Sequence, residues 1–371
     1  MNSKILRNYD FVLLFTIIVL SLFGILMVTA STVPAGTPLM EMLKNSFVSK
    51  QIFFVVVGTG AMLVMSLIDY SEWRQFVIPF YLLNLALLAI VMIMGHSALG
   101  AQRWIDLGFF KLQPSEFAKI AIIITLSSIM AKEGRKIEGW LDLIIPFAHV
   151  SLPMLLIFLQ PDLGTSLVFI AITGVILFVA GLKWLQMAVL ATGGLMGSIY
   201  AFFFVFRDYQ RGRLIIFLDP WQDPLGMGWQ IIQSKIAIGS GQFWGRGLFG
   251  GTQTQLNFLP EKHTDFIFSV IGEELGFLGG SLTLLVYLFL VWQIIGVGLK
   301  AKDNLGRFIC VGVAAMLVFQ LLVNVGMTIG IMPVTGLPLP LISSGGSSFV
   351  ATCLGLGLVL SVAAHSDTSM F

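Results

Sequence analysis

The sequence predicts an all-α integral membrane protein with about ten transmembrane helices. Apolar residues make up 57% of the 371 residues and charged residues only 11%, whereas charged residues make up about 25% of soluble domains. The mean hydropathy is +0.94. Apolar runs close to the length that crosses a bilayer, about 20 residues, recur along the whole chain.

Ten apolar runs define the predicted spans, and short polar turns separate most of them. The runs cover residues 11–30, 52–68, 77–94, 117–130, 143–159, 166–180, 185–206, 266–297, 307–331 and 346–364. The first run resembles a signal peptide, but its length favours a membrane helix. The eighth run is too long for one straight span, and its glycines between positions 272 and 280 predict a break.

No stretch is left over for a separate soluble core, so residues 1–371 are predicted to form a single membrane domain. Its large extracytoplasmic loop covers residues 207–265, between the seventh and eighth spans. Lys and Arg are more frequent in the connections on the N-terminal side than in the short connections opposite, which predicts cytoplasmic N- and C-termini. The informative polar sequence then lies at the outer face, where we expect the chemistry.

Several function classes lack support in the sequence. The net charge of +2 is too small to indicate a nucleic-acid partner. Cys310 and Cys353 lie in apolar runs, where a thiol behaves as a small hydrophobic group. No P-loop, dinucleotide fingerprint, HExxH or CxxC motif occurs. Any work therefore draws on an ion gradient or on a substrate that is already activated.

The densest group of ionisable side chains, Glu261, Lys262, His263 and Asp265, comes just before the eighth span. A charge in hydrocarbon costs about 2.5–3.5 kcal/mol on insertion scales, so such a cluster indicates a function. A fixed carboxylate can take a proton from a hydroxyl nucleophile, which is typically worth about 10²–10⁴-fold. Asp265 is the best candidate for this base. The alternative is that Thr264 or Asp265 only caps the helix.

Glu273 and Glu274 follow two helical turns later. We interpret them as braces of the broken helix that pair with Lys119 or with an arginine elsewhere. A catalytic or binding role is the alternative.

A second motif extends from Gly100 to Lys119. Pro114 is typical of a first helical position, and Glu116 is favoured near a helix N-terminus. Lys119 is costly inside a membrane unless an acid meets it, and Trp104 is a common interfacial anchor. Arg103 and Lys119 could instead bind phosphate, and both interpretations stay open.

Two further segments carry charge at the predicted outer face. Asp162 follows a Pro-containing turn and is predicted to start the next helix, with pairing to an outer cation as the alternative. Arg211 and Arg213 could hold an anionic head group through bidentate contacts or could anchor the topology. Isoleucines between Ile231 and Ile238 suit an interfacial amphipathic helix.

Five separated motifs together resemble the SEDS family of polytopic peptidoglycan polymerases. They cover residues 100–119, 160–165, 208–241, 251–274 and 338–348, and the resemblance spans nearly the whole chain. Gln242 and Arg246 depart from the glycine and lysine that are frequent in the family. Gly251-Thr252-Gln253 makes the chain more similar to the elongation members than to the division members.

The resemblance implies a glycosyltransferase that joins lipid II units at the outer face of the bacterial cytoplasmic membrane. Asp265 matches the family's essential aspartate. Structural or substrate-binding roles are implied for Trp104, Glu116, Lys119, Asp162, Arg211 and Ser347, and Arg103, Arg213, Lys262 and His263 complete the candidate binding set. A single displacement would invert the anomeric centre.

A pyrophosphate leaving group needs positive charge beside it, from these cations or from a divalent cation such as Mg²⁺ or Mn²⁺. No metal-binding motif identifies residues for such an ion. A class B penicillin-binding transpeptidase is the implied partner. The competing function is a flippase for lipid-linked cell-wall precursors, and a weaker alternative is a scaffold for other enzymes.

Overall fold

The computed structural model describes residues 8–94, 96–98, 101–106, 108, 110–132, 137–206 and 208–366. Its ten longest helices coincide with the ten predicted spans: α2 (Phe11–Thr32), α4 (Ser46–Leu67), α5 (Val77–Met94), α6 (Pro114–Met130), α7 (Ile144–Leu159), α8 (Leu163–Val179), α9 (Trp184–Phe204), α13 (Ile267–Leu299), α14 (Asn304–Ile329) and α15 (Gly346–Ala364). Eight are long and apolar enough to cross a membrane. The helices α6 and α8 have 17 residues each, which gives a length of about 26 Å. The predicted all-α membrane fold is confirmed.

The connections contain shorter elements: α3 (Leu39–Lys44), η1 (Tyr70–Phe76), η2 (Leu141–Leu143), α10 (Asp208–Leu218), η3 (Pro220–Gln222), α11 (Met227–Gly241) and α12 (Thr252–Gln255). One feature was not predicted. The strands β1 (His96–Ala98), β2 (Ala101–Asp106) and β3 (Lys111–Leu112) form a small antiparallel sheet that leads into α6. The hydrogen bonds between these strands pair backbone N–H and C=O groups of a segment that is not helical.

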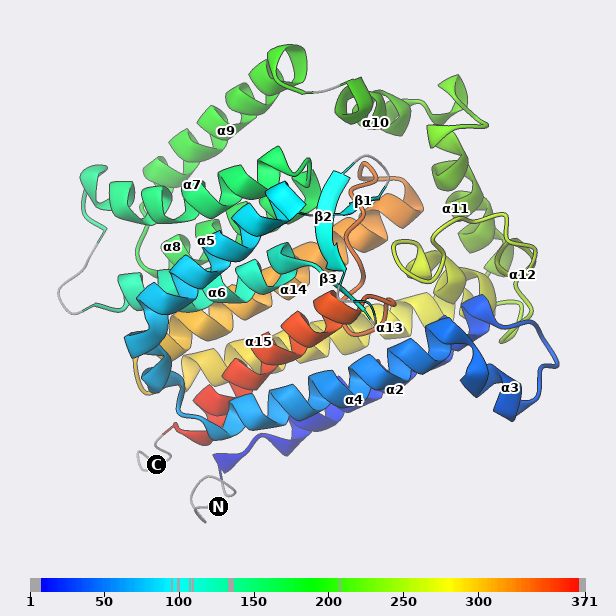
Figure 1. Cartoon of the computed structure of the whole chain (residues 1–371), viewed down its shortest axis with the longest axis horizontal. Coiled ribbons are helices and arrows are strands. Elements are labelled where there is room, and N and C mark those ends of the chain that lie inside the picture. The colour runs from blue at the N-terminus through cyan, green and yellow to red at the C-terminus, as the bar shows by residue number, and fades with distance from the viewer. Residues whose placement is uncertain are drawn as a thin grey trace.

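The two helices α14 and α15 lie at the centre of the bundle. The helix α14 packs against α6, α8, α11 and α13, and α15 packs mainly against α4. Close packing against α4 depends on Gly357 of α15, because a Cβ atom there would lie 2.7 Å from the carbonyl oxygen of Met62. In contrast, α9 stands apart from the other long helices (Figure 1), and the most hydropathic part of α9 has no buried residue.

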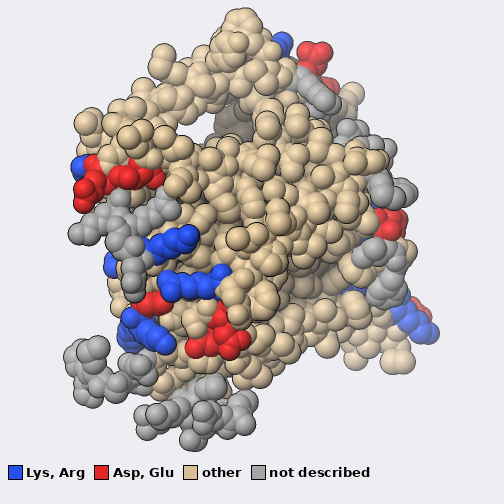
Figure 2. Space-filling view, turned by 60° about the vertical axis from the view of Figure 1, so that its left-hand side comes forward, with Lys and Arg blue, Asp and Glu red and all other residues tan. Residues whose placement is uncertain are grey.

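Exposed apolar side chains cover the outside of the bundle, as expected for a surface that faces lipid. Figure 2 shows that most of the charged side chains in view gather at the left and lower left, with a few at the top and right margins, whereas the centre of the visible surface is uncharged. The two ends of the described chain meet on one side of the bundle (Figure 1), where the Asn8 side chain donates a 2.9 Å hydrogen bond to the carbonyl oxygen of Ser366. An even number of spans requires this arrangement.

The predicted break in the eighth span is present at Gly276 of α13, whose φ of 65° is left-handed. A helix break frees backbone groups that lipid cannot satisfy. The loop after α11 satisfies them: the N–H groups of Phe277 and Leu278 donate to Gln242 and Phe243 over 2.9 and 3.2 Å, and the N–H of Arg246 donates to the Glu273 carbonyl over 3.0 Å. This glycine-rich loop therefore packs into the break and fixes the start of α13.

Candidate active site

Asp265 lies in a cavity of about 410 Å³ that is formed by segments far apart in the sequence. Strand β2, the N-terminal ends of α6 and α8, helix α10 and the loop between α14 and α15 all contribute. Seven of the eleven predicted site residues line it: Arg103, Trp104, Glu116, Asp162, Arg213, Asp265 and Ser347. We call it the polar cavity.

The Asp265 carboxyl group is not a helix cap. The N-cap of α13 is Phe266, and it makes no side-chain cap hydrogen bond, while the Thr264 hydroxyl donates to Glu261. The capping alternative is therefore wrong. Burial, with a smaller contribution from the negative charge of Glu261, raises the pKa of Asp265 to about 6, although Arg213 and Arg103 oppose the shift. A carboxylate with a pKa near neutrality suits a general base.

Three cationic side chains line the polar cavity: Arg103, Lys111 and Arg213. Backbone carbonyls accept hydrogen bonds from both arginines. The Arg103 guanidinium donates to the carbonyl of Gln160 over 3.2 Å and also to that of Pro161. Arg213 Nη1 donates to the Val334 carbonyl over 3.0 Å. The charge of both arginines acts on Asp265, because each of them opposes the rise in its pKa.

Asp162 combines both roles considered for it. It is the N-cap of α8, accepting from the Thr165 N–H over 3.2 Å and from the Thr165 hydroxyl over 2.9 Å. One of its carboxylate oxygens also lies 3.9 Å from Arg103 Nη1. The carboxylate therefore helps to place Arg103 while it starts α8.

Glu116 and Lys119 form an ion pair over 2.7 Å, with 4% and 1% of their side chains exposed. Glu116 lines the polar cavity, whereas Lys119 does not. The predicted pairing of Glu273 or Glu274 with Lys119 is therefore wrong, because Glu116 on the same helix is closer. Glu273 nevertheless braces the fold, since its carboxylate accepts from the N–H groups of Gln253 and Thr254 over 2.7 and 3.0 Å.

Ser347 ties the small sheet to the end of α15. Its hydroxyl accepts from the Gln113 N–H and donates to the Lys111 carbonyl, each over 3.1 Å. Ser347 thus forms part of the cavity wall through backbone contacts, and its neighbours Gly345 and Gly346 line the same wall.

Three other predicted residues lie away from the polar cavity. Arg211 donates to the Phe203 carbonyl over 2.8 Å, near the end of α9. Lys262 donates to the Asn257 side chain over 2.7 Å and to the Thr254 carbonyl. The His263 ring packs against Phe47 with a centroid distance of 4.3 Å. Burial lowers the pKa of Lys262 and of His263.

Several cavity residues were not named as individual candidates: Lys111, Gln113, Thr165 and Ser344, which lie within the motifs, and Thr335 and Gly336, which lie outside them. The Ser-Ser-Gly-Gly-Ser-Ser run at 343–348 was a signal, because six small residues in succession are unusual before an apolar span. The others carry no local pattern that separates them from ordinary loop residues.

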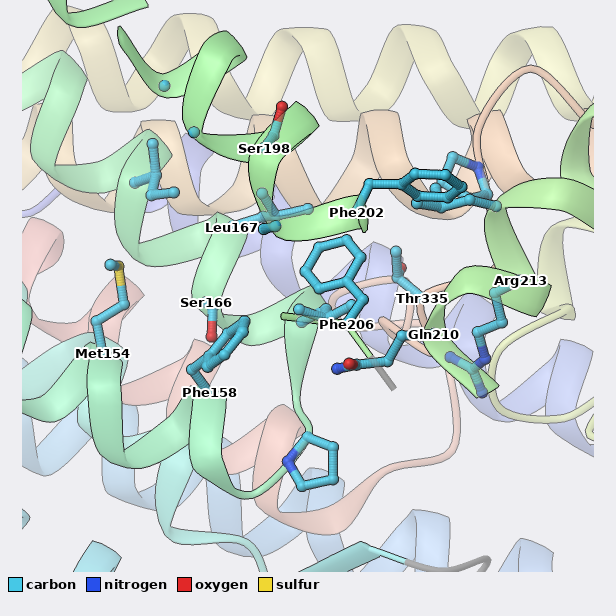
Figure 3. Close-up of a pocket in the computed structure, with 18 of the residues that line it drawn as sticks. Met154, Phe158, Ser166, Leu167, Ser198, Phe202, Phe206, Gln210, Arg213 and Thr335 are labelled. Atoms are coloured by element: carbon cyan, nitrogen blue, oxygen red, sulfur yellow. The ribbon is translucent and has the colours of Figure 1, made fainter. Parts of the chain in front are cut away.

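A second, apolar cavity of about 970 Å³ adjoins the polar one. It lies between α7, α8, α9 and α10, and Figure 3 shows the rings of Phe158, Phe202 and Phe206 around it. The face of α9 toward it carries small residues, including Gly194, Gly197 and Ser198. Arg103, Arg213 and Thr335 line both cavities. The two arginines therefore stand where an apolar chamber meets the chamber of Asp265.

Within the described residues, no group of three His, Cys, Asp or Glu side chains is placed to hold a metal ion. Near Asp265, Glu116 is paired with Lys119, and Asp162 is occupied at the start of α8. The positive charge that the protein itself provides here comes from Arg103, Arg213 and Lys111.

Comparisons with known proteins agree with this architecture. Residues 11–368 match the family of cell cycle proteins that groups FtsW, RodA and SpoVE. A probable peptidoglycan glycosyltransferase FtsW of Trichlorobacter lovleyi is 39% identical over 97% of this chain and 94% of its own length. The peptidoglycan glycosyltransferase MrdB of Escherichia coli is 40% identical over 84% of each chain.

Solved structures show the same fold. A chain from a structure described as a peptidoglycan synthase complex that coordinates polymerization and crosslinking superposes with a TM-score of 0.81 at 34% identity, covering 97% of this chain and 99% of that one. The rod shape determining protein RodA of Thermus thermophilus gives a TM-score of 0.72 at 30% identity, with coverage of 97% and 98%.

The fold and the paired cavities define a polytopic membrane protein with a polar site beside an apolar chamber. The chain belongs to the SEDS family of FtsW and RodA peptidoglycan glycosyltransferases.

Proposed function

We propose that this peptidoglycan glycosyltransferase polymerises lipid II and that Asp265 is its general base. The observation that carries the proposal is the junction of the two cavities at Arg103 and Arg213. A lipid-linked sugar pyrophosphate has three parts: an apolar chain, a doubly charged linker and a polar saccharide. The apolar cavity, the two arginines and the polar cavity match these parts in the same order.

The proposed reaction is a single displacement. A hydroxyl oxygen of the acceptor saccharide forms a bond to the anomeric carbon of the donor, and its proton passes to the Asp265 carboxylate. The bond between that carbon and the pyrophosphate oxygen breaks, and its electron pair leaves with the pyrophosphate. Arg103 and Arg213 stabilise this developing negative charge. Substitution of this kind inverts the anomeric centre.

We infer that the polar cavity faces the outside of the bacterial cytoplasmic membrane, with both termini in the cytoplasm. The distribution of Lys and Arg in the connections supports this orientation. We also infer a role in cell elongation, supported by the resemblance of Gly251-Thr252-Gln253 to elongation members. A class B penicillin-binding transpeptidase is the proposed partner, in keeping with the synthase complex among the similar structures.

The test is polymerisation of purified lipid II without an energy source. We expect the native protein to form glycan strands, and Asp265→Asn to reduce the rate by about 10² or more, because the amide cannot accept the proton. The matched control is Asp208→Asn, which changes an exposed aspartate of α10 that lines neither cavity. It should leave the rate within about twofold of native, as surface substitutions usually have small effects.

Full activity of Asp265→Asn would remove the proposed base. Absence of polymer from the native protein, with and without a transpeptidase partner, would favour transport of the lipid-linked precursor instead.

A further inference from the structure

The segment that carries Asp265 is held by a clamp on three successive backbone carbonyls. These belong to His263, Thr264 and Asp265, which precede the first turn of α13. The donors are the Ser344 N–H over 2.8 Å, the Ser343 hydroxyl over 2.5 Å and the Asn324 side-chain amide over 2.9 Å, respectively. The clamp fixes the backbone at Asp265 without using its carboxylate.

Asn324 lies at the centre of this arrangement. It is fully buried on α14, and its amide nitrogen donates a second hydrogen bond to the Leu337 carbonyl over 2.8 Å. An Asn amide nitrogen has two hydrogens, so both are used. The reverse orientation would point the amide oxygen at two carbonyl oxygens, and electrostatic repulsion excludes it.

The second bond of Asn324 sets the opposite wall of the polar cavity. Leu337 follows Gly336, whose φ of +76° is left-handed, and a Cβ atom at Gly336 would lie 3.3 Å from Asp265 Oδ2. One buried amide therefore binds both the backbone of Asp265 and the loop segment at Gly336 and Leu337, which the Asp265 carboxylate faces. The distance between the two depends on this amide.

We propose that Asn324 is a positioning residue for the glycosyl transfer, acting through Asp265 and without contact to the substrate. The inference rests on the proposed function of Asp265. Reacting groups must approach to about 3–3.5 Å, and a displacement of about 1 Å can reduce a rate about 10²-fold. Because Asn324 does not line either cavity, its loss should affect turnover and leave substrate affinity nearly unchanged.

The test compares Asn324→Leu with Gln320→Leu. Leucine keeps roughly the side-chain volume at position 324 and removes both donors. Gln320 lies one turn earlier on the same face of α14, is fully buried, and has no hydrogen-bond partner within the described ranges. Gln320→Leu is therefore a matched polar-to-apolar change without a clamp to break. For each variant, the concentration of protein that binds lipid II is measured first by titration. The rates are then expressed per molecule of folded, binding-competent protein.

We expect Asn324→Leu to lower kcat by about 30–300-fold, within the range that positioning effects cover, with KM and the lipid II Kd changed less than about threefold. Gln320→Leu should keep kcat within about twofold. If Asn324→Leu does not fold, Ser343→Ala tests the same clamp at the neighbouring carbonyl and should lower kcat about five- to tenfold at constant KM.

A kcat within threefold of native for the folded Asn324→Leu protein, or a rise in KM that matches the fall in kcat, would overturn the proposal. So would native kcat in Ser343→Ala where Asn324→Leu cannot be purified. The Asp265→Asn variant tests the proposed function separately. If Asp265→Asn is inactive and Asn324→Leu has the native kcat, only the positioning role of Asn324 is rejected.

Discussion

The ion pair of Glu116 and Lys119 gives the sharpest prediction about stability. Lys119 Nζ lies 2.7 Å from Glu116 Oε2, and at most 4% of either side chain is exposed. Lys119→Met keeps most of the packing and leaves the Glu116 carboxylate without its partner in the interior. Breaking a buried pair costs about 3–5 kcal/mol, because one charge is left uncompensated. We expect a loss of that size in the free energy of unfolding.

The double variant Glu116→Gln/Lys119→Met should recover most of the loss and lie within about 1–2 kcal/mol of native, because replacing both charges removes the desolvation cost as well. Denaturant unfolding in detergent micelles measures all variants. Lys235→Met, an exposed lysine on α11, is the control and should change stability by less than about 0.5 kcal/mol. A loss below about 1 kcal/mol for Lys119→Met, or equal losses for the single and double variants, would refute the reasoning.

Two other predictions concern pH and backbone strain. Asp265 must be deprotonated to act as a base, and its pKa is raised to about 6. The value of kcat/KM should therefore be constant above about pH 6 and fall about tenfold per pH unit below it. A fall in kcat/KM that begins only near about pH 4 would contradict this prediction. Gly276→Ala should destabilise the protein by at least about 2 kcal/mol in the same unfolding assay, since φ is +65° and the new Cβ would lie 2.3 Å from the Gly245 nitrogen. Gly60→Ala, which has open space within α4, is its control and should be neutral or slightly stabilising.

The sequence predicted correctly those structural features that depend on one short segment. Pro114 starts α6 and Asp162 caps α8, because both effects depend on the residue and the next three or four positions. The break in α13 followed from its length and glycines. The capping interpretation of Asp265 failed because the turn before α13 is held by bonds from α14 and from residues 343 and 344, which no local pattern records.

Arg211 and Arg213 show why the site could not be completed from the sequence. They are two residues apart on α10, and a helix rotates by about 200° over two residues, so the two side chains point in nearly opposite directions. Arg213 reaches both cavities, whereas Arg211 binds the end of α9. Both residues carry the same charge, so the sequence does not distinguish them. The packing of α10 against the rest of the protein decides that Arg213 faces Asp265.

The sequence by itself determined the class, the ten spans and the identity of the ionisable groups at the predicted outer face, because the transfer of apolar residues into lipid is a sum over neighbouring positions. Tertiary structure alone decided that Arg103, Asp162, Arg213 and Asp265 share one cavity and that Asn324 holds its two walls together. Contacts between residues so far apart in the chain depend on how helices pack, and packing is set by the shapes of whole helix faces.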